Sequence, residues 1–194
     1  PAAFAALNRG RIERCFTINS AVVSDYCSPA GGFVGTNFGT VTQCGVSGGT
    51  VSFAEGKFGT SHGGFVGNQR GGSIEECFST ASVNAQKWAG GFAGKIEDGT
   101  ITDCYTCGTV TGTDENGGFA GAYMDPAAVK NVYAANEVSA SSGGGIAGGK
   151  GGTFTSAGVP ENSYYCSDCS LPVNSGAFEN SVEWEKSAAE MRSA

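Results

Sequence analysis

The chain has 194 residues, of which 33 are glycine and only 15% are charged, and its formal net charge is −7. Two leucines are too few for a helical bundle, and five prolines without glycine at every third position exclude collagen. The acidic balance argues against nucleic acid as a partner, and no apolar stretch approaches the roughly 20 residues that span a bilayer. A β-rich domain with many turns and a proper core remains.

A five-residue motif recurs along the chain. Gly-Gly-Phe-Val/Ala-Gly begins at residues 31, 63, 90 and 117, a degenerate copy begins at residue 2, and a copy with Ile for Phe begins at residue 144. These starts are separated by 29, 32, 27, 27 and 27 residues. A constant period in this range indicates a repeat protein, so we predict about six units.

Each unit continues with a polar turn and two short runs rich in β-branched and aromatic residues. The first run leads to a cysteine in four units and to Val132 in the fifth, and the second run ends in a valine. Such short strands cannot bury a face alone, but they can when they stack on neighbouring units. An antiparallel sandwich is the alternative, although it does not explain the constant spacing.

We therefore predict an all-β fold, a β-solenoid of about six coils with repeats of about 27 residues. Its parallel sheets should be in register, with coils about 4.8 Å apart. The solenoid should cover residues 1–165. Residues 166–194 drift from the pattern and should form an irregular or helical tail, which serves as a cap or as a subunit-docking segment.

An in-register solenoid places equivalent side chains on top of one another. One predicted internal ladder contains the motif phenylalanines, with Ile146 in the last unit: Phe4, Phe33, Phe65, Phe92 and Phe119. The motif glycines would permit either a positive φ at a corner or a close approach of two backbone segments.

The eight cysteines fall into two groups. Cys15, Cys44, Cys77 and Cys104 share one repeat position, and we expect them to be small apolar residues of the core ladder. Parallel side chains on adjacent coils keep their Cβ atoms too far apart for a disulfide without distortion. The others lie outside this column and are candidates for disulfide crosslinks within or between chains: Cys27, Cys107, Cys166 and Cys169.

Two Cys-x-x-Cys pairs raise the alternative of structural zinc. Cys104 and Cys107 lie on a predicted strand, where residues three apart face opposite sides. The second pair, Cys166 and Cys169, follows only after 58 intervening residues, which is beyond the spacing of a zinc ribbon. We therefore predict no metal site.

Other candidates for chemistry are equally weak. Residues 144–150 resemble a phosphate-binding loop, but no Ser or Thr follows Lys150 and the match is itself a repeat copy. His62, the single histidine, should be a solvated turn residue. The acidic pairs Glu75-Glu76, Glu97-Asp98 and Asp114-Glu115 should serve surface solubility. We predict no catalytic residue and no cofactor.

The repeat resembles the GLUG repeat of bacterial and archaeal surface proteins. The shared order is Gly-Gly-Phe-Val-Gly, a polar turn, Gly-Thr-Ile and then Cys-Tyr/Phe, and residues 162–165 and 186–191 are similar to segments that follow such arrays. The first unit departs from the pattern at Ala2, Ala3 and Ala6. The resemblance implies an exported protein of the cell surface or an adhesin, without a general catalytic site.

The first recognisable unit begins at Ala2, so we expect no N-terminal cap on the solenoid. The favoured function is a non-enzymatic structural subunit that binds copies of itself head-to-tail in an extracellular filament or sheath. The alternative is a fragment of a cell-surface adhesin or glycan-binding stalk, in which Tyr26, Trp88 and Tyr123 would stack on sugars. An enzyme acting on polysaccharides is the third and least favoured hypothesis.

Overall fold

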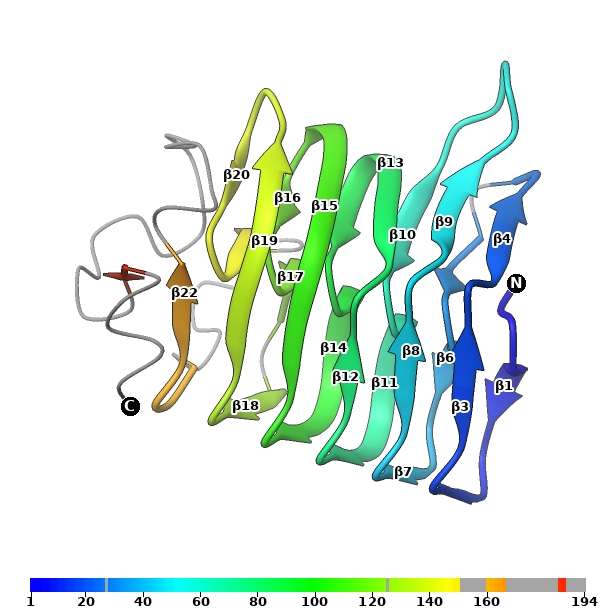
Figure 1. Ribbon diagram of the computed structural model, residues 1–194, viewed down its shortest axis with the longest axis vertical. Helices are drawn as coiled ribbons and strands as arrows, with labels where there is room; N and C mark the ends of the chain where they lie inside the picture. Colours follow the sequence, from blue (N-terminus) through cyan, green and yellow to red (C-terminus); the bar gives the residue numbers. More distant parts are fainter. Residues whose placement is uncertain (27, 125, 151–159, 167–184, 188–194) are drawn as a thin grey trace.

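The computed structural model describes residues 1–26, 28–124, 126–150, 160–166 and 185–187. Every regular element in these residues is a β-strand. The strands wind into a β-solenoid of about five turns, with the N-terminal coil at one end (Figure 1). The prediction of an all-β parallel solenoid is therefore confirmed. The sixth motif copy leads into residues 151–159, which lie outside the described residues.

The strands follow one another around each coil. The first coil contains β1 (Ala5–Asn8), β2 (Arg11–Glu13), β3 (Phe16–Ile18) and β4 (Ala21–Ser24). The second contains β5 (Ala30–Gly31), β6 (Val34–Asn37), β7 (Thr40–Thr42), β8 (Gly45–Ser47) and β9 (Thr50–Phe53). The third contains β10 (Thr60–Gly63), β11 (Val66–Glu75), β12 (Phe78–Ser79) and β13 (Ser82–Gly90).

Strands are longest and fewest in the fourth coil, and the fifth coil again has several shorter strands. The fourth coil contains β14 (Ala93–Thr102) and β15 (Tyr105–Asp114). The fifth contains β16 (Asn116–Gly117), β17 (Ala120–Tyr123), β18 (Ala128–Lys130) and β19 (Tyr133–Ser139). After it come β20 (Gly143–Gly144), β21 (Ala147–Lys150), β22 (Tyr164–Cys166) and β23 (Glu185–Lys186). The helix expected in the tail falls in residues outside the described ones.

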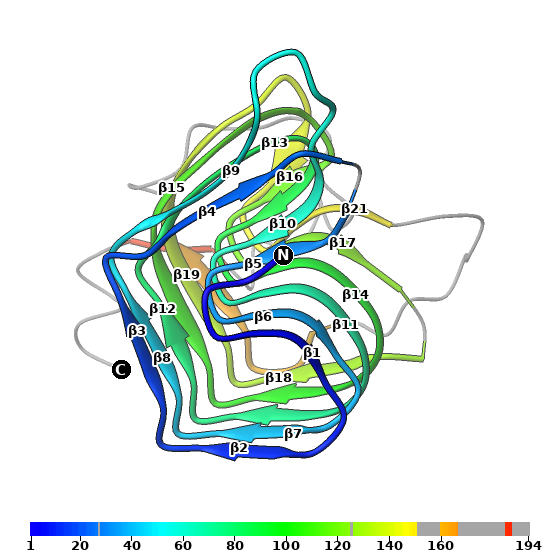
Figure 2. The same ribbon diagram turned by 90° about the vertical axis from the view of Figure 1, so that its right-hand side faces the viewer.

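Every described strand pair is parallel, and the register follows the motif spacing. Val66 pairs with Val34 on one side and with Ala93 on the other, so the pairing steps by 32 and then 27 residues. The view along the axis shows the coils superimposed, with a large lower lobe and a narrower upper lobe (Figure 2). The main core fills the lower lobe, and two smaller clusters around Val51 and Val110 lie apart from it.

The motif glycines are required by close backbone approach. A Cβ atom on Gly63 would overlap the carbonyl oxygen of Val66, and one on Gly64 would overlap the carbonyl oxygen of Gly91 in the next coil. A Cβ on Gly94 would overlap the backbone of Ser61 in the preceding coil. These glycines do not have positive φ. Of the two expected roles, they therefore serve the close approach of two backbone segments and not a left-handed corner.

A corner made of left-handed residues other than glycine repeats in every coil. It directly precedes the cysteine position, and its φ angles lie between 47° and 55° at Arg14, Gln43, Glu76, Asp103, Asn131 and Asn162. Residues with a Cβ atom pay a steric cost in this conformation. The corner ends one strand and turns the chain sharply into the next.

The second coil carries a protruding segment. Residues 54–59 extend beyond the outline of the solenoid between β9 and β10 (Figure 1). This segment accounts for the 32-residue spacing of that unit. The regular pairing resumes immediately, because His62 pairs with both Ala30 and Ala89.

Candidate functional site

The motif phenylalanines form a continuous ladder through the main core. Adjacent ring centroids are 4.7–4.9 Å apart and the ring planes are within 20° of parallel. Phe33, Phe65, Phe92 and Phe119 are fully buried, whereas Phe4 is 48% exposed. One face of the Phe4 ring stacks on Phe33, and its other face has no further coil to cover it in the described structure.

The other end of this ladder is closed. Ile146 takes the place of Phe in the last motif copy. The ring of Tyr165 lies against Gly145, where any Cβ atom would overlap it, and packs against the main core. Ile146 is only 4% exposed, whereas Phe4 is 48% exposed, so the ladder is buried at Ile146 and open at Phe4.

The cysteine column has a hydrogen-bonding role that an apolar assignment does not describe. The thiols of Cys15, Cys44, Cys77 and Cys104 each donate to the carbonyl oxygen two residues earlier, at 3.1–3.3 Å. The Sγ atoms of Cys44 and Cys77 also accept the backbone N–H of the cysteine in the preceding coil, at 3.4 Å. Each thiol thus closes the left-handed corner and links two coils.

Ser163 reproduces this role at the far end of the column. Its hydroxyl donates to the carbonyl of Glu161 at 2.9 Å and accepts the N–H of Val132 at 3.4 Å. The same two contacts therefore recur with oxygen in place of sulfur. A small side chain with one donor and one acceptor is what this position selects.

The thiols of Cys44 and Cys77, in the middle of the column, are chemically quiet. The hydrogen bond with Cys104, together with burial, raises the pKa of the Cys77 thiol to about 12. The hydrogen bond with Cys77 and burial raise the pKa of Cys44 well above its usual range. Nucleophiles and metal ligands need the thiolate, which these groups do not form near neutral pH. Within the described residues, no group of three or more His, Cys, Asp or Glu side chains could hold a metal ion.

The predicted crosslinks are only partly placed. Cys107 is a half-buried free thiol on β15, and burial raises its pKa. A bond between Cys107 and another chain stays a prediction. Cys166 is buried at the end of β22. Cys27 and Cys169 lie outside the described residues.

The expectation for His62 is wrong. Its side chain is fully buried, because it occupies the column of Ala30 and Ala89 beneath the protruding segment. Nδ1 lies 3.0 Å from the carbonyl oxygen of Asn84 and must carry the proton, while buried Nε2 has no hydrogen-bond partner. Burial lowers the pKa of His62.

The aromatic residues expected to bind sugars are mostly unsuited to it. Tyr123 is 1% exposed, and its hydroxyl donates to the carbonyl of Ala127 at 2.7 Å, so it is a core residue. Trp88 has the ammonium groups of Lys87 and Lys95 over its ring, at 5.1 and 4.9 Å from the centroid. Tyr26 alone is highly exposed, at 77%. Sugar stacking needs an open ring face. The Tyr26 ring is the most open of the three, although the ammonium group of Lys57 lies 6.0 Å from its centroid.

Two of the three acidic pairs contact basic residues, and Glu76 of the third pair accepts a hydrogen bond from Gln43 at 2.8 Å. Glu97 contacts Lys95 and Arg70, each at 2.7 Å, and Lys87 contacts both Asp114 and Glu115. Burial opposes the ionisation of Glu97, but hydrogen bonds from Lys95 and Asn68 and the nearby positive charges outweigh it and lower the pKa. These contacts explain the pairs without a catalytic role.

A second aromatic ladder runs along the outside of the solenoid. Phe78 stacks on Tyr105 at 5.3 Å, and Tyr105 stacks on Tyr133 at 5.2 Å. Gly45 leaves a gap through which Phe78 reaches Phe16, at 6.3 Å. In the sequence, an aromatic residue directly follows the cysteine position in most units, and this recurrence could have predicted the outer ladder. Because the rings stack on one another, they present edges and not faces to solvent.

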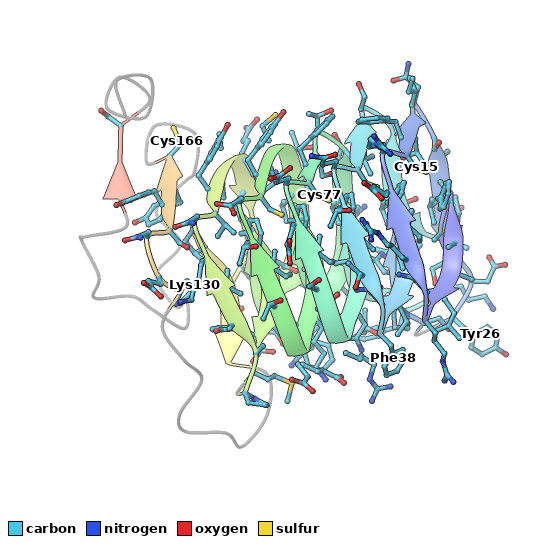
Figure 3. The ribbon with its side chains drawn as sticks, turned by 90° about the horizontal axis from the view of Figure 1, so that it is seen from below. Cys15, Tyr26, Phe38, Cys77, Lys130 and Cys166 are labelled. Atoms are coloured by element: carbon cyan, nitrogen blue, oxygen red, sulfur yellow. The ribbon has the colours of Figure 1, made fainter. Side chains whose placement is uncertain are left out.

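The first coil exposes most of the apolar surface. Each of β1, β2, β3 and β4 pairs only with the following coil. Among the residues that the structure describes, eight of the nine exposed large hydrophobic ones lie between residues 4 and 58, and Figure 3 shows Tyr26 and Phe38 at this end. We call the surface formed by the open edges of β1–β4 the head face; its exposed side chains are Phe4, Leu7, Phe16, Ile18 and Val23.

The first coil also differs in charge. Arg9, Arg11 and Arg14 against Glu13 and Asp25 give residues 1–30 a net charge of +1, which leaves −8 for residues 31–194. The single carboxylate of Glu13 contacts both Arg11, at 2.9 Å, and Arg14, at 3.8 Å. Positive charge therefore remains uncompensated at this end.

Comparisons with known proteins add no family assignment. Neither a protein-family model nor a curated protein nor a solved structure matches the chain. None of the described residues forms a helix long and apolar enough to cross a membrane. The geometry alone therefore identifies the candidate site: the head face of a parallel β-solenoid.

Proposed function

We propose that this protein is a non-enzymatic structural subunit whose copies bind one another head-to-tail through the head face. The observation that carries the proposal is the combination of open strand edges and exposed apolar side chains on one coil. Open edges are templates for pairing with another chain, and soluble proteins normally blunt them. A head-to-tail contact that does not close produces a filament or sheath.

The two ladders support this reading. The inner ladder is buried at Ile146 and open at Phe4, so Phe4 is the end that offers apolar area to another copy. Phe16, which begins the outer ladder, is 57% exposed. Covering these side chains would remove apolar area from water, worth about 25 cal/mol per Å² before the costs of association.

The proposed location is outside the cell, at or beyond the cell surface. This part rests on the resemblance to GLUG repeat proteins and on the eight cysteines, which suit an oxidising compartment. The second candidate function, an adhesin or glycan-binding stalk, has one supporting observation in the exposed ring of Tyr26.

Sedimentation velocity and negative-stain microscopy over a range of concentrations, under native and non-reducing conditions, test the proposal. Wild-type protein should form polymers. Val23→Lys and Ile18→Lys should weaken association at least tenfold, because charge on an edge strand opposes pairing. Thr111→Lys is the matched control, since Thr111 is an exposed residue at the equivalent position of the fourth coil. Dispersed wild-type monomers at every concentration would overturn the proposal.

A further inference from the structure

We infer that the head face binds the acidic C-terminal segment, residues 160–194, of a second copy. This inference rests on the proposed function and names the partner surface within it. Three observations carry it: the charge of the head face, the charge of the segment, and a steric block against a coil of the ordinary kind.

The charge distribution makes the two ends complementary. Residues 160–194 contain six acidic and two basic residues, a net charge of −4 in 35 residues. Residues 31–159 also carry −4, but spread over 129 residues. The first coil is the only one of these three parts with a positive balance. Opposite charges on two ends favour one orientation and speed the encounter.

The basic residues of the head face are available to a partner. Arg11 and Arg14 share one carboxylate, and their side chains are 69% and 74% exposed. The guanidinium of Arg9 lies 5.3 Å from the centroid of the exposed Phe38 ring. In contrast, Lys87 and Lys95 in the middle coils are engaged by carboxylates and are much less exposed.

A coil stacked in the ordinary register does not fit in front of the first coil. In later coils the third motif glycine packs against the backbone of the preceding coil: a Cβ on Gly67 would lie 2.6 Å from Ala30 N, and one on Gly121 would overlap Trp88. The equivalent residue of the first coil is Ala6, which is exposed. Its methyl group occupies the space that a preceding coil would need.

The partner must therefore avoid the corner at Ala6 and approach the open edges of β2, β3 and β4, where Arg11, Arg14 and Ile18 lie. The segment 160–194 contains no copy of the motif, so its sequence does not call for the stacking of an ordinary coil at this corner. It also supplies carboxylates for the arginines. Coils in the middle of another copy carry the motif, and their negative charge is more dilute.

Charge reversal in the full-length chain tests this assignment. The head-reversed variant is Arg9→Glu/Arg11→Glu/Arg14→Glu, and the tail-reversed variant is Glu179→Lys/Glu183→Lys/Glu190→Lys. Each variant alone carries like charges on both ends and should associate at least tenfold more weakly than wild type. An equimolar mixture should recover association, because each head then meets a tail of opposite charge.

The controls separate this inference from the proposed function. Glu75→Lys/Glu137→Lys changes net charge away from the head face and from residues 160–194 and should leave association unchanged. Circular dichroism checks that each variant is folded. If wild type associates while the reversed variants associate equally well, or if the mixture does not recover, the partner surface is wrong but self-assembly stands. If wild type does not associate at all, the proposed function fails first.

Discussion

The first coil and the fourth coil are built from the same sequence pattern, yet their equivalent residues differ in burial. Phe92, Cys104 and Val110 of the fourth coil are buried. In the first coil the equivalent ladder residue Phe4 is about half exposed, and Cys15 is half-buried. The difference lies in the neighbours, because a repeat contacts only the repeats beside it. One sequence pattern therefore makes a core in the middle of the molecule and an interaction surface at its end.

Truncation of the inner ladder gives the largest expected contrast. Phe92→Ala removes a ring stacked on both sides and should lower the free energy of unfolding by about 3–5 kcal/mol. Phe4→Ala removes a ring stacked on one side only and should cost about 1 kcal/mol. Denaturant unfolding measures both. Equal losses at the two positions would contradict the contrast.

The cysteine column should show the same contrast at a smaller scale. Cys77→Ala removes the bond to the carbonyl of Glu75 and leaves the buried N–H of Cys44 without an acceptor, at a cost of about 1–3 kcal/mol. Cys77→Ser should retain most of the stability, as Ser163 indicates. Cys15→Ala should cost less than Cys77→Ala, because its solvated partners can bind water. Thermal unfolding under reducing conditions ranks the three variants.

A pH titration distinguishes the third coil, which contains His62, from the others. Burial holds the pKa of folded His62 below its ordinary value of 6.5, so the unfolded chain takes up the proton first as the pH falls. Stability should be full above about pH 6.5 and decrease below it, by at most about 1.4 kcal/mol per pH unit. Unfolding at pH 7.5 and pH 5.5 measures the change, and this range lies above the titration of Glu97 and Asp114, whose pKa values are lowered.

His62→Leu serves as the control for this titration. It removes the imidazole and should reduce the dependence of stability on pH between 5.5 and 7.5, which leaves the contribution of the Pro1 amino group, whose pKa is also lowered by burial. A slope that survives undiminished in His62→Leu would assign the effect to another group.

The smallest expected effect is a gain in stability from asparagine at the left-handed corner, and it should be equal in an end coil and in an inner coil. Gln43→Asn and Arg14→Asn place a residue that tolerates the left-handed conformation at the strained corner, as Asn131 and Asn162 already do. Each should stabilise the fold by about 0.5 kcal/mol. This effect is local to the backbone, so it should not depend on the number of neighbouring coils. A gain confined to one coil, measured by thermal unfolding, would refute that independence.

The constant motif spacing predicted the coils, the parallel register and the phenylalanine ladder, because repetition fixes which residues are neighbours. His62 and Tyr123 were misplaced because each was read as a residue of a turn. Compared with the other units, His62 shares its column with Ala30 and Ala89, and Tyr123 pairs with buried Ile96. Reading along columns would have predicted both as buried.

Other features could not be read from spacing. The bond between a thiol and the carbonyl two residues earlier depends on the left-handed corner, which is occupied by residues as different as Arg14 and Asp103. A buried amide ladder is a similar case: Asn8 donates to Asn37, which donates to Gln69, at 2.8 and 2.9 Å. The sequence offers polar residues there, and only the register makes them partners.

The protruding segment of the second coil has a practical consequence. Residues 54–59 leave and rejoin the wall without disturbing the pairing on either side, so this corner accepts extra chain at little cost to the fold. A polymer of such subunits would display whatever is inserted here at regular intervals along its length. The same corner therefore offers evolution a place to add recognition loops, and offers the engineer a site for presenting foreign peptides in a periodic array.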